Sequence, residues 1–214
     1  MLGSHLLHQS GPSIPVGEKW TFTSNGSWVA PANGNYKITL VGAGGKGGSG
    51  CDRKTNWDYD LYRCYVCDFC GSGSGGGGGA GQTIVRTYML KKDTSLTITI
   101  GRPNSNPSKV SGGISLTANG GGTGGSAYTY SHDGYCQDKV VAGGVAANYG
   151  TGGSSGYVSE RNNHSPGGGA GKVSYYGHGY GAGGAGGRGS WNNGSFLPGN
   201  NGTAGICVIE YMGR

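Results

Sequence analysis

Glycine pairs separated by single larger residues run through this chain, most clearly in residues 42–50, Gly-Ala-Gly-Gly-Lys-Gly-Gly-Ser-Gly. The interruptions, Ala43, Lys46 and Ser49, recur at every third residue. Three residues is the period of the extended left-handed polyproline-type helix, whose backbone amides have no partners inside the helix. Those amides must bond to neighbouring segments or to water. Two glycines in three leave two faces open to close neighbours, so the pattern predicts glycine helices packed side by side.

The same three-residue phase returns later in the chain. It is present in residues 121–126, 143–154 and 181–189, whereas residues 71–81 are almost pure glycine and residues 166–172 are a weaker case. With 51 glycines among 214 residues, the chain could also be read as a flexible linker. A flexible linker would not need the same three-residue spacing in several separate tracts. We therefore expect an ordered bundle.

Alternating apolar and polar residues predict β-strands around the glycine tracts. One hairpin is predicted across Asn25-Gly26, between strands at 19–24 and 27–29. A second hairpin is predicted between strands at 83–90 and 96–100. Further strands are expected at 36–41, 114–117, 172–176 and 206–211.

No segment has the pattern of an amphipathic α-helix, and only 34% of the residues are hydrophobic. A conventional core can therefore serve only part of the chain. We assign Trp20, Phe22 and Trp28 to that core. The predicted fold class is all-β with irregular structure: a small β-sandwich framing a bundle of polyglycine II helices, with little or no α-helix.

The chain divides into two parts. Residues 1–17, punctuated by Pro12 and Pro15, are predicted to be a tether or docking segment. Residues 18–214 are predicted to be one glycine-rich domain with a loop insertion at 51–70.

The net charge of +6 comes from basic residues that are mostly scattered singly, which predicts a mildly basic surface and no nucleic-acid partner. No apolar run is long enough for a membrane span, and the first residues lack the charged and apolar regions of a secretory signal peptide. The five histidines stand apart from any acid or nucleophile, and no tract ends in the Gly-Lys-Ser/Thr of a phosphate loop. We therefore expect no enzyme.

The insertion at 51–70 holds four of the six cysteines: Cys51, Cys64, Cys67 and Cys70. Spacing by two residues is typical of thiolate metal sites, so these four could bind a structural metal, the one cofactor that the sequence suggests. Disulfides are the alternative, with Cys136 as a fifth loop cysteine, and free thiols are a third. These three readings stay open. Cys207 is expected to be an ordinary buried strand thiol.

Aromatic residues gather in the segments between predicted strands. Rigid aromatic side chains in loops are suited to recognising sugar faces or protein loops, because they offer contact area at low entropy cost. Covering the ends of the glycine bundle is the alternative role. The candidate binding residues are Trp57, Tyr59, Tyr62, Tyr65, Tyr128, Tyr130, Tyr135, Tyr157, His164 and Trp191.

Residues 20–31, 36–48, 96–101 and 205–211 together resemble the glycine-rich tip domains of bacteriophage and prophage tail fibres and adhesins. The resemblance implies strands that frame a stack of glycine helices, with variable loops at the far end that touch the bacterial surface. It further implies a receptor-binding adhesin located in the virion at the tail-fibre tip. The expected partners are a bacterial surface protein or glycan and other tail-fibre or virion proteins, with a homotrimer as the candidate assembly. A structural virion protein, such as a decoration, collar or fibre component, is the alternative.

Three connections are richest in aromatic and charged residues: 52–69, 128–138 and 157–164. Because straight tracts must be joined at their two ends, we predict that at least two of these connections lie together at one end. There they would form the binding surface, held in position by the glycine bundle.

Overall fold

The computed structural model describes residues 14–50, 72–132, 135–139, 153, 156, 158–159, 168–171, 179–187 and 198–214. All regular secondary structure in these residues is β-strand, and none of them is helical. The strands are β1 (Lys19–Phe22), β2 (Gly26–Val29), β3 (Gly34–Val41), β4 (Ser72–Gly73), β5 (Thr83–Leu90), β6 (Ser95–Thr99), β7 (Ser108–Gly112), β8 (Leu116–Ala118), β9 (Tyr128–His132), β10 (Tyr135–Lys139), β11 (Val158–Ser159) and β12 (Ile206–Gly213).

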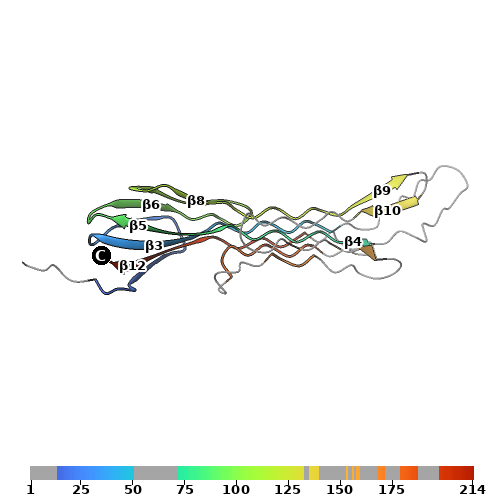
Figure 1. Cartoon of the computed structure of the whole chain (residues 1–214). Helices are drawn as coiled ribbons and strands as arrows, with labels where there is room; N and C mark the ends of the chain where they lie inside the picture. The colour runs from blue at the N-terminus through green and yellow to red at the C-terminus, as the bar shows by residue number, and fades with distance from the viewer. Residues whose placement is uncertain are drawn as a thin grey trace, which may run out of the picture.

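Two four-stranded antiparallel sheets lie together at one end of the molecule (Figure 1). One has the strand order β1-β12-β3-β5 and the other β2-β6-β7-β8. We refer to residues 14–41, 83–118 and 206–214, which contain both sheets, as the two-sheet body. The C-terminal residue lies at the outer end of this body (Figure 1).

The two sheets share one hydrophobic core cluster. Leu96, Ile98 and Val110 from one sheet and Ile38, Leu40 and Ile209 from the other are all fully buried or nearly so. Aromatic rings fill one part of this cluster, where the centroids of Trp20 and Trp28 lie 5.3 Å apart and those of Trp28 and Tyr36 lie 5.1 Å apart. Trp28 is buried in the cluster, and Trp20 and Phe22 pack against it, as predicted for the three residues.

Neither predicted hairpin exists. β1 pairs with β12, and β2 pairs with β6, so the chain around Asn25-Gly26 crosses from one sheet to the other. The side chain of Asn25 is used for this crossing, since its Oδ1 accepts a hydrogen bond of 2.8 Å from the Ile100 amide. The crossing places Trp20 in one sheet and Trp28 in the other, and their rings meet at the shared core, where Trp28 is buried and Trp20 half-buried.

The second predicted hairpin fails for the same kind of reason. β5 pairs with β3, and β6 pairs with β2 and β7, because the chain changes sheets after Leu90. The connection between β5 and β6 is bonded to the connection between β2 and β3: the Asp93 amide donates to the Ala30 carbonyl and the Ala30 amide to the Thr94 carbonyl. Two sheet-to-sheet connections thus support each other.

The strands predicted at 36–41 and 206–211 are confirmed as parts of β3 and β12, and the strand predicted at 114–117 corresponds to β8. The strand predicted at 172–176 lies outside the described residues. β7 was not predicted, because Ser108–Gly112 has only one large apolar residue, Val110.

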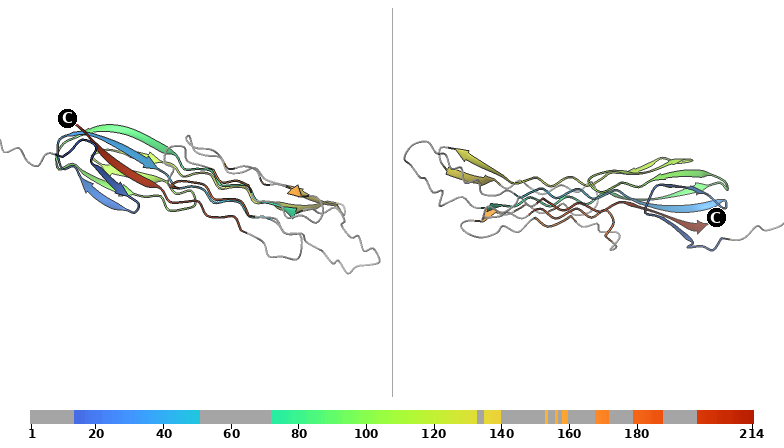
Figure 2. Two further views of the ribbon diagram at one scale, coloured as in Figure 1. Left: turned by 90° about the horizontal axis from the view of Figure 1, so that it is seen from below. Right: turned by 180° about the vertical axis from the view of Figure 1, so that it is seen from behind.

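Extended glycine-rich segments leave the body and run side by side toward the opposite end (Figures 1 and 2). We refer to the described residues in 42–50, 74–82, 119–127, 168–171, 179–187 and 198–205 as the glycine stack. Backbone hydrogen bonds join these segments at intervals of three residues. The amides of Gly42, Gly45 and Gly48 donate to the carbonyls of Gln82, Gly79 and Gly76, at 2.8–2.9 Å.

Within segment 42–50, the first glycine of each pair bonds in a different direction from the second. The amides of Gly44 and Gly47 donate to the carbonyls of Thr203 and Asn200, both at 2.9 Å. The Ala43 and Lys46 carbonyls accept from the amides of Gly121 and Gly124. Segment 42–50 therefore bonds to several neighbouring segments. Its bonds to each of them recur every three residues, the spacing of the larger residues in the sequence.

Burial differs from one segment to the next. Every residue of 74–82 is buried. In 42–50 the glycines are buried, whereas Lys46 and Ser49 are half-buried. In 198–205 the fully buried positions are Gly199, Gly202 and Gly205. A segment that is covered by neighbours on more of its sides thus has a higher proportion of glycine.

Polar groups fasten the stack to the body. The Ser108 hydroxyl, fully buried, donates to the Val41 carbonyl at 2.7 Å and accepts from the Gly101 amide at 2.9 Å. The amides of Asn104 and Ser105, both at φ 74°, donate to the carbonyl of Gly44. Non-glycine residues rarely adopt this left-handed conformation, and here the two bonds to Gly44 support it.

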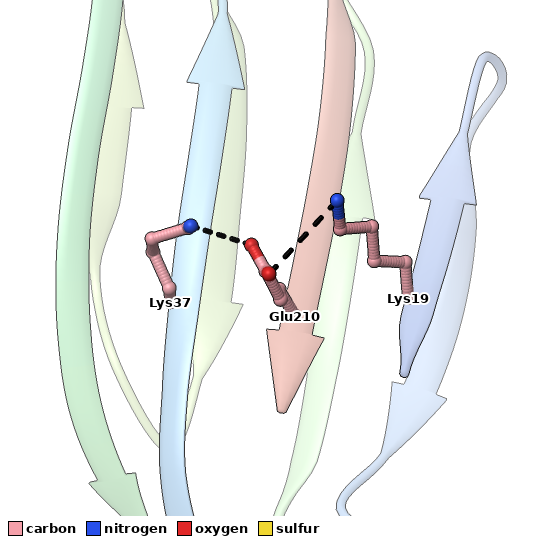
Figure 3. Close-up of polar contacts among 3 residues, drawn as sticks. All are labelled: Lys19, Lys37 and Glu210. Atoms are coloured by element: carbon pink, nitrogen blue, oxygen red, sulfur yellow. Dashed lines mark ion pairs between the residues drawn. The ribbon is translucent and has the colours of Figure 1, made fainter. Parts of the chain in front are cut away.

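An ionic group lies on the outer face of the sheet that contains β12 (Figure 3). Glu210 Oε2 lies 2.5 Å from Lys37 Nζ, and Glu210 Oε1 lies 3.9 Å from Lys19 Nζ. The hydrogen bond from Lys37 is the main reason that the pKa of Glu210 lies below its ordinary value of 4.5. This group joins three adjacent strands, β3, β12 and β1.

Candidate binding site

The end of the molecule opposite the two-sheet body carries strands β9, β10 and β4 (Figure 1). Segment 119–127 of the stack leads directly into β9, which pairs antiparallel with β10. β4 follows the insertion 51–70 in sequence and pairs with β11, so that Gly73 lies opposite Val158. β10 lies beside β4. Segments far apart in sequence therefore meet at this end, which we call the far end.

The described residues of two predicted connections come together at the far end. Most of 128–138 forms β9 and β10, and Val158–Ser159 of 157–164 forms β11. The connection 52–69 lies outside the described residues, although β4, two residues beyond Cys70, is at this end. That these connections form a binding surface stays a prediction.

Three of the ten candidate binding residues lie in described strands: Tyr128 and Tyr130 in β9 and Tyr135 in β10. Their register is fixed by the pairing of Tyr128 with Lys139, Tyr130 with Gln137 and His132 with Tyr135. The other seven lie outside the described residues: Trp57, Tyr59, Tyr62, Tyr65, Tyr157, His164 and Trp191.

The sequence reading treated 128–138 as a loop and missed its strands. The signal was present, because Tyr-Thr-Tyr-Ser-His alternates large and small residues. The next two residues in sequence are Asp133 and Gly134, a pair typical of two-residue hairpin turns. Gln137 and Lys139 were consequently not recognised as neighbours of the tyrosines.

Some of the predicted cysteine sites lie within the described residues and others lie outside them. Cys51, Cys64, Cys67 and Cys70 lie outside the described residues, and Cys136 lies in β10 opposite Ser131. Cys207 is a free, fully buried thiol, as predicted, and burial raises its pKa to about 12. Its thiolate is therefore scarce at neutral pH, which makes it a poor nucleophile or metal ligand. Within the described ranges, no group of three or more His, Cys, Asp or Glu residues is arranged to hold a metal ion.

The outer end of the body has a different surface. Val16, Met89 and Met212 are 69%, 77% and 43% exposed. Asn35 pairs with both Met89 and Gly213, and a Cβ added at Gly213 would contact Val16, so the three apolar residues lie along one end of a single sheet. Lys91 and Lys92, both exposed, follow directly after β5.

The described part of the predicted tether, residues 14–17, lies against this end of the body. Ile14 packs against the core cluster, and the Gly17 amide donates to the Tyr211 carbonyl at 2.8 Å. Both residue 14 and the C-terminal residue are thus at the body and away from the far end (Figure 2).

No protein-family model matches this chain, and no curated protein is significantly similar to it. Among the described residues there is no helix of the length and hydrophobicity that crossing a membrane requires.

Proposed function

We propose that this protein is a receptor-binding adhesin at the tip of a phage or phage-like tail. The observation that carries the proposal is the meeting of β9, β10, β4 and β11 at the far end, opposite both described ends of the chain. In this proposal the two-sheet body attaches to the particle and the far end meets the bacterial surface. Backbone bonds at three-residue intervals make the glycine stack a rigid spacer between the two.

The same proposal includes the finer architecture. The tracts are polyglycine II helices, since their bonds to each neighbour recur at the three-residue period of such helices, and the two sheets form a β-sandwich around their shared core. Hydrogen exchange followed by mass spectrometry tests the ordering of the tracts. Amides in 74–82 should exchange slowly, whereas exchange at the rate of an unstructured peptide would contradict the proposal.

A second candidate is a structural virion component without receptor binding. The exposed apolar row of Val16, Met89 and Met212 favours it, because such a row at the outer end of the body is suited to assembly. The same row is also needed for attachment of an adhesin. The two functions therefore differ in what the far end does.

Binding to cells separates them. The fluorescently labelled full chain should bind a subset of a panel of bacterial strains and should compete with adsorption of the parent particle to those strains. Tyr130→Ala, Trp57→Ala and Tyr157→Ala should weaken binding without lowering the melting temperature. Met89→Ser is the matched control at the opposite end and should bind like the unaltered protein.

Two results would reject the adhesin. One is the absence of binding across the panel, together with normal adsorption of particles that lack this protein. The other is many copies along the particle body and none at a distal tip, as seen by labelling with antibody and electron microscopy. The second result would support the structural alternative.

A further inference from the structure

The pairing register of β9 with β10 separates the residues of this hairpin into two chemically different sets. Residues that are opposite each other in an antiparallel pair share a face, and alternate residues along a strand do so as well. One face therefore contains all the aromatic residues of the two strands together with an amide and a cation: Tyr128, Tyr130, His132, Tyr135, Gln137 and Lys139. The other face contains Thr129, Ser131, Cys136 and Asp138.

We propose that the face of the β9–β10 hairpin that holds Tyr128, Tyr130 and Tyr135 is a binding platform for an anionic bacterial glycan. This inference rests on the proposed adhesin function and identifies the class of its receptor. It follows from the placement of six residues by backbone register at the far end of the molecule.

Three tyrosines on one face suit a carbohydrate better than a folded protein loop. The apolar C–H side of a sugar ring packs on an aromatic ring, and the phenol and amide groups exchange hydrogen bonds with sugar hydroxyls. A row of such residues along a two-stranded ribbon offers successive positions for successive sugars of an extended chain. Tyrosine also loses little conformational entropy on binding, because it has only two side-chain torsions.

Charge selects the kind of glycan. The tyrosine face has Lys139 and His132 and no carboxylate, since Asp138, the one acidic residue of the two strands, is on the opposite face. Carboxylate or phosphate groups on a sugar would be attracted to Lys139 and would meet no like charge on this face. Uronic acids and sugar phosphates share this chemistry, and they can come from a capsule or from lipopolysaccharide.

The first experiment uses cells that the labelled protein binds. Periodate, which cleaves vicinal diols of sugars, should reduce binding at least tenfold, and digestion of surface proteins with protease should leave it unchanged. Loss after protease treatment with no effect of periodate would overturn the glycan inference and would leave the adhesin function standing. Absence of binding to untreated cells would overturn both.

The second experiment uses the purified full chain with capsular polysaccharide and lipopolysaccharide prepared separately from the same strain. Binding by one preparation and not the other identifies the source of the glycan, and either result supports the inference. Reduction of the carboxyl groups, or removal of the phosphates, should weaken binding at least tenfold, as should raising the salt from 50 to 500 mM. Equal binding of the neutralised and native polysaccharides would overturn the proposal that the glycan is anionic, whatever the affinities of the hairpin variants.

The hairpin supplies its own matched controls. Tyr130→Ala and Lys139→Gln should each reduce affinity for the polysaccharide at least fivefold. Thr129→Ala and Asp138→Asn, at the adjacent positions in sequence, which pair with each other on the other face, should not. If Tyr130→Ala disturbs the hairpin, Tyr130→Phe and Lys139→Gln remain as conservative changes with a separate readout, the salt dependence of binding. Equal losses from changes on both faces would overturn the assignment of the site to the tyrosine face.

Discussion

The two-sheet body and the glycine stack are stabilised in opposite ways. In the body, large side chains such as Tyr36, Ile38 and Leu96 are fully buried against one another, and the backbone pairs within sheets. In the stack, backbones lie so close that a Cβ built at Gly44, Gly78 or Gly184 would overlap a carbonyl oxygen of a neighbouring segment. The body therefore loses stability when side-chain atoms are removed, and the stack loses it when they are added.

The largest effect is expected from adding a side chain to the stack. Gly44→Val and Gly184→Val should each prevent folding, because the new Cβ would overlap the Ala182 or the Asn200 carbonyl and separate segments that share backbone bonds. Each buried amide left unpaired costs roughly 1–3 kcal/mol, and several would be lost at once. Circular dichroism and size-exclusion chromatography of the purified variants would measure this.

The control for that experiment is Lys46→Val, which places the same side chain in the same tract at the half-buried third position. Its melting temperature should change by only a few degrees. Similar damage from valine at positions 44 and 46 would show that the three-residue phase has no structural meaning.

The next largest effect should come from emptying the core of the body. Leu96→Ala should lower the free energy of unfolding by about 2–5 kcal/mol, the usual range for removing a buried leucine side chain. Urea denaturation followed by tryptophan fluorescence includes a signal from this region, because two of the four tryptophans, Trp20 and Trp28, lie in the same cluster. A loss below 1 kcal/mol would mean that the two sheets are not held by this core.

Ser108→Ala tests the junction of the two regions. It removes the hydroxyl that bonds to both Val41 and Gly101, and we expect a loss of about 1–3 kcal/mol in the free energy of unfolding. Hydrogen exchange should increase first at the beginning of segment 42–50, near the altered contact. Exchange that increases only at the far end would argue against a role for Ser108 in fastening the stack.

The smallest effect concerns the ionic group on the outer face of the body. The pKa of Glu210 is lowered in the folded protein, so the stabilisation that its charge provides is present above the ordinary pKa of 4.5 and is lost as the pH falls through the folded value. Glu210→Gln should therefore cost less than about 1 kcal/mol at pH 7 and nothing near pH 2. Urea melts of both proteins at the two pH values would measure the difference, and a larger cost at the lower pH would contradict the assignment.

The three-residue spacing of contacts in the glycine stack was easier to predict from the sequence than the pairing of strands in the two-sheet body. Glycine spacing reports which sides of a segment have neighbours, and the nearly pure glycine of 74–81 corresponds to complete burial. Alternation in a strand reports which face is buried but not which strand lies beside it. Hence the strands flanking Asn25-Gly26 could be recognised while their partners, β12 and β6, could not.

The candidate site shows the same limit. Tyr128, Tyr130 and Tyr135 were recognisable as aromatic residues outside the main strands, but their common face depends on the register of β9 with β10. Gln137 and Lys139 join them only through that register. Alternation across Asp133-Gly134 would have been sufficient to suggest it.

Equal spacing of the bonds in the stack has a consequence for how the chain finds its native alignment. Because each segment meets each neighbour every three residues, sliding one segment by three residues brings glycine amides opposite carbonyls again. The alignment is set by contacts that do not repeat: the Asn104 and Ser105 amides on the Gly44 carbonyl, and the Gln82 side chain, whose Oε1 accepts from the Asn119 amide at 3.0 Å. These contacts occur once, at the edge of the two-sheet body, so the body selects one alignment for segments that could not select it themselves.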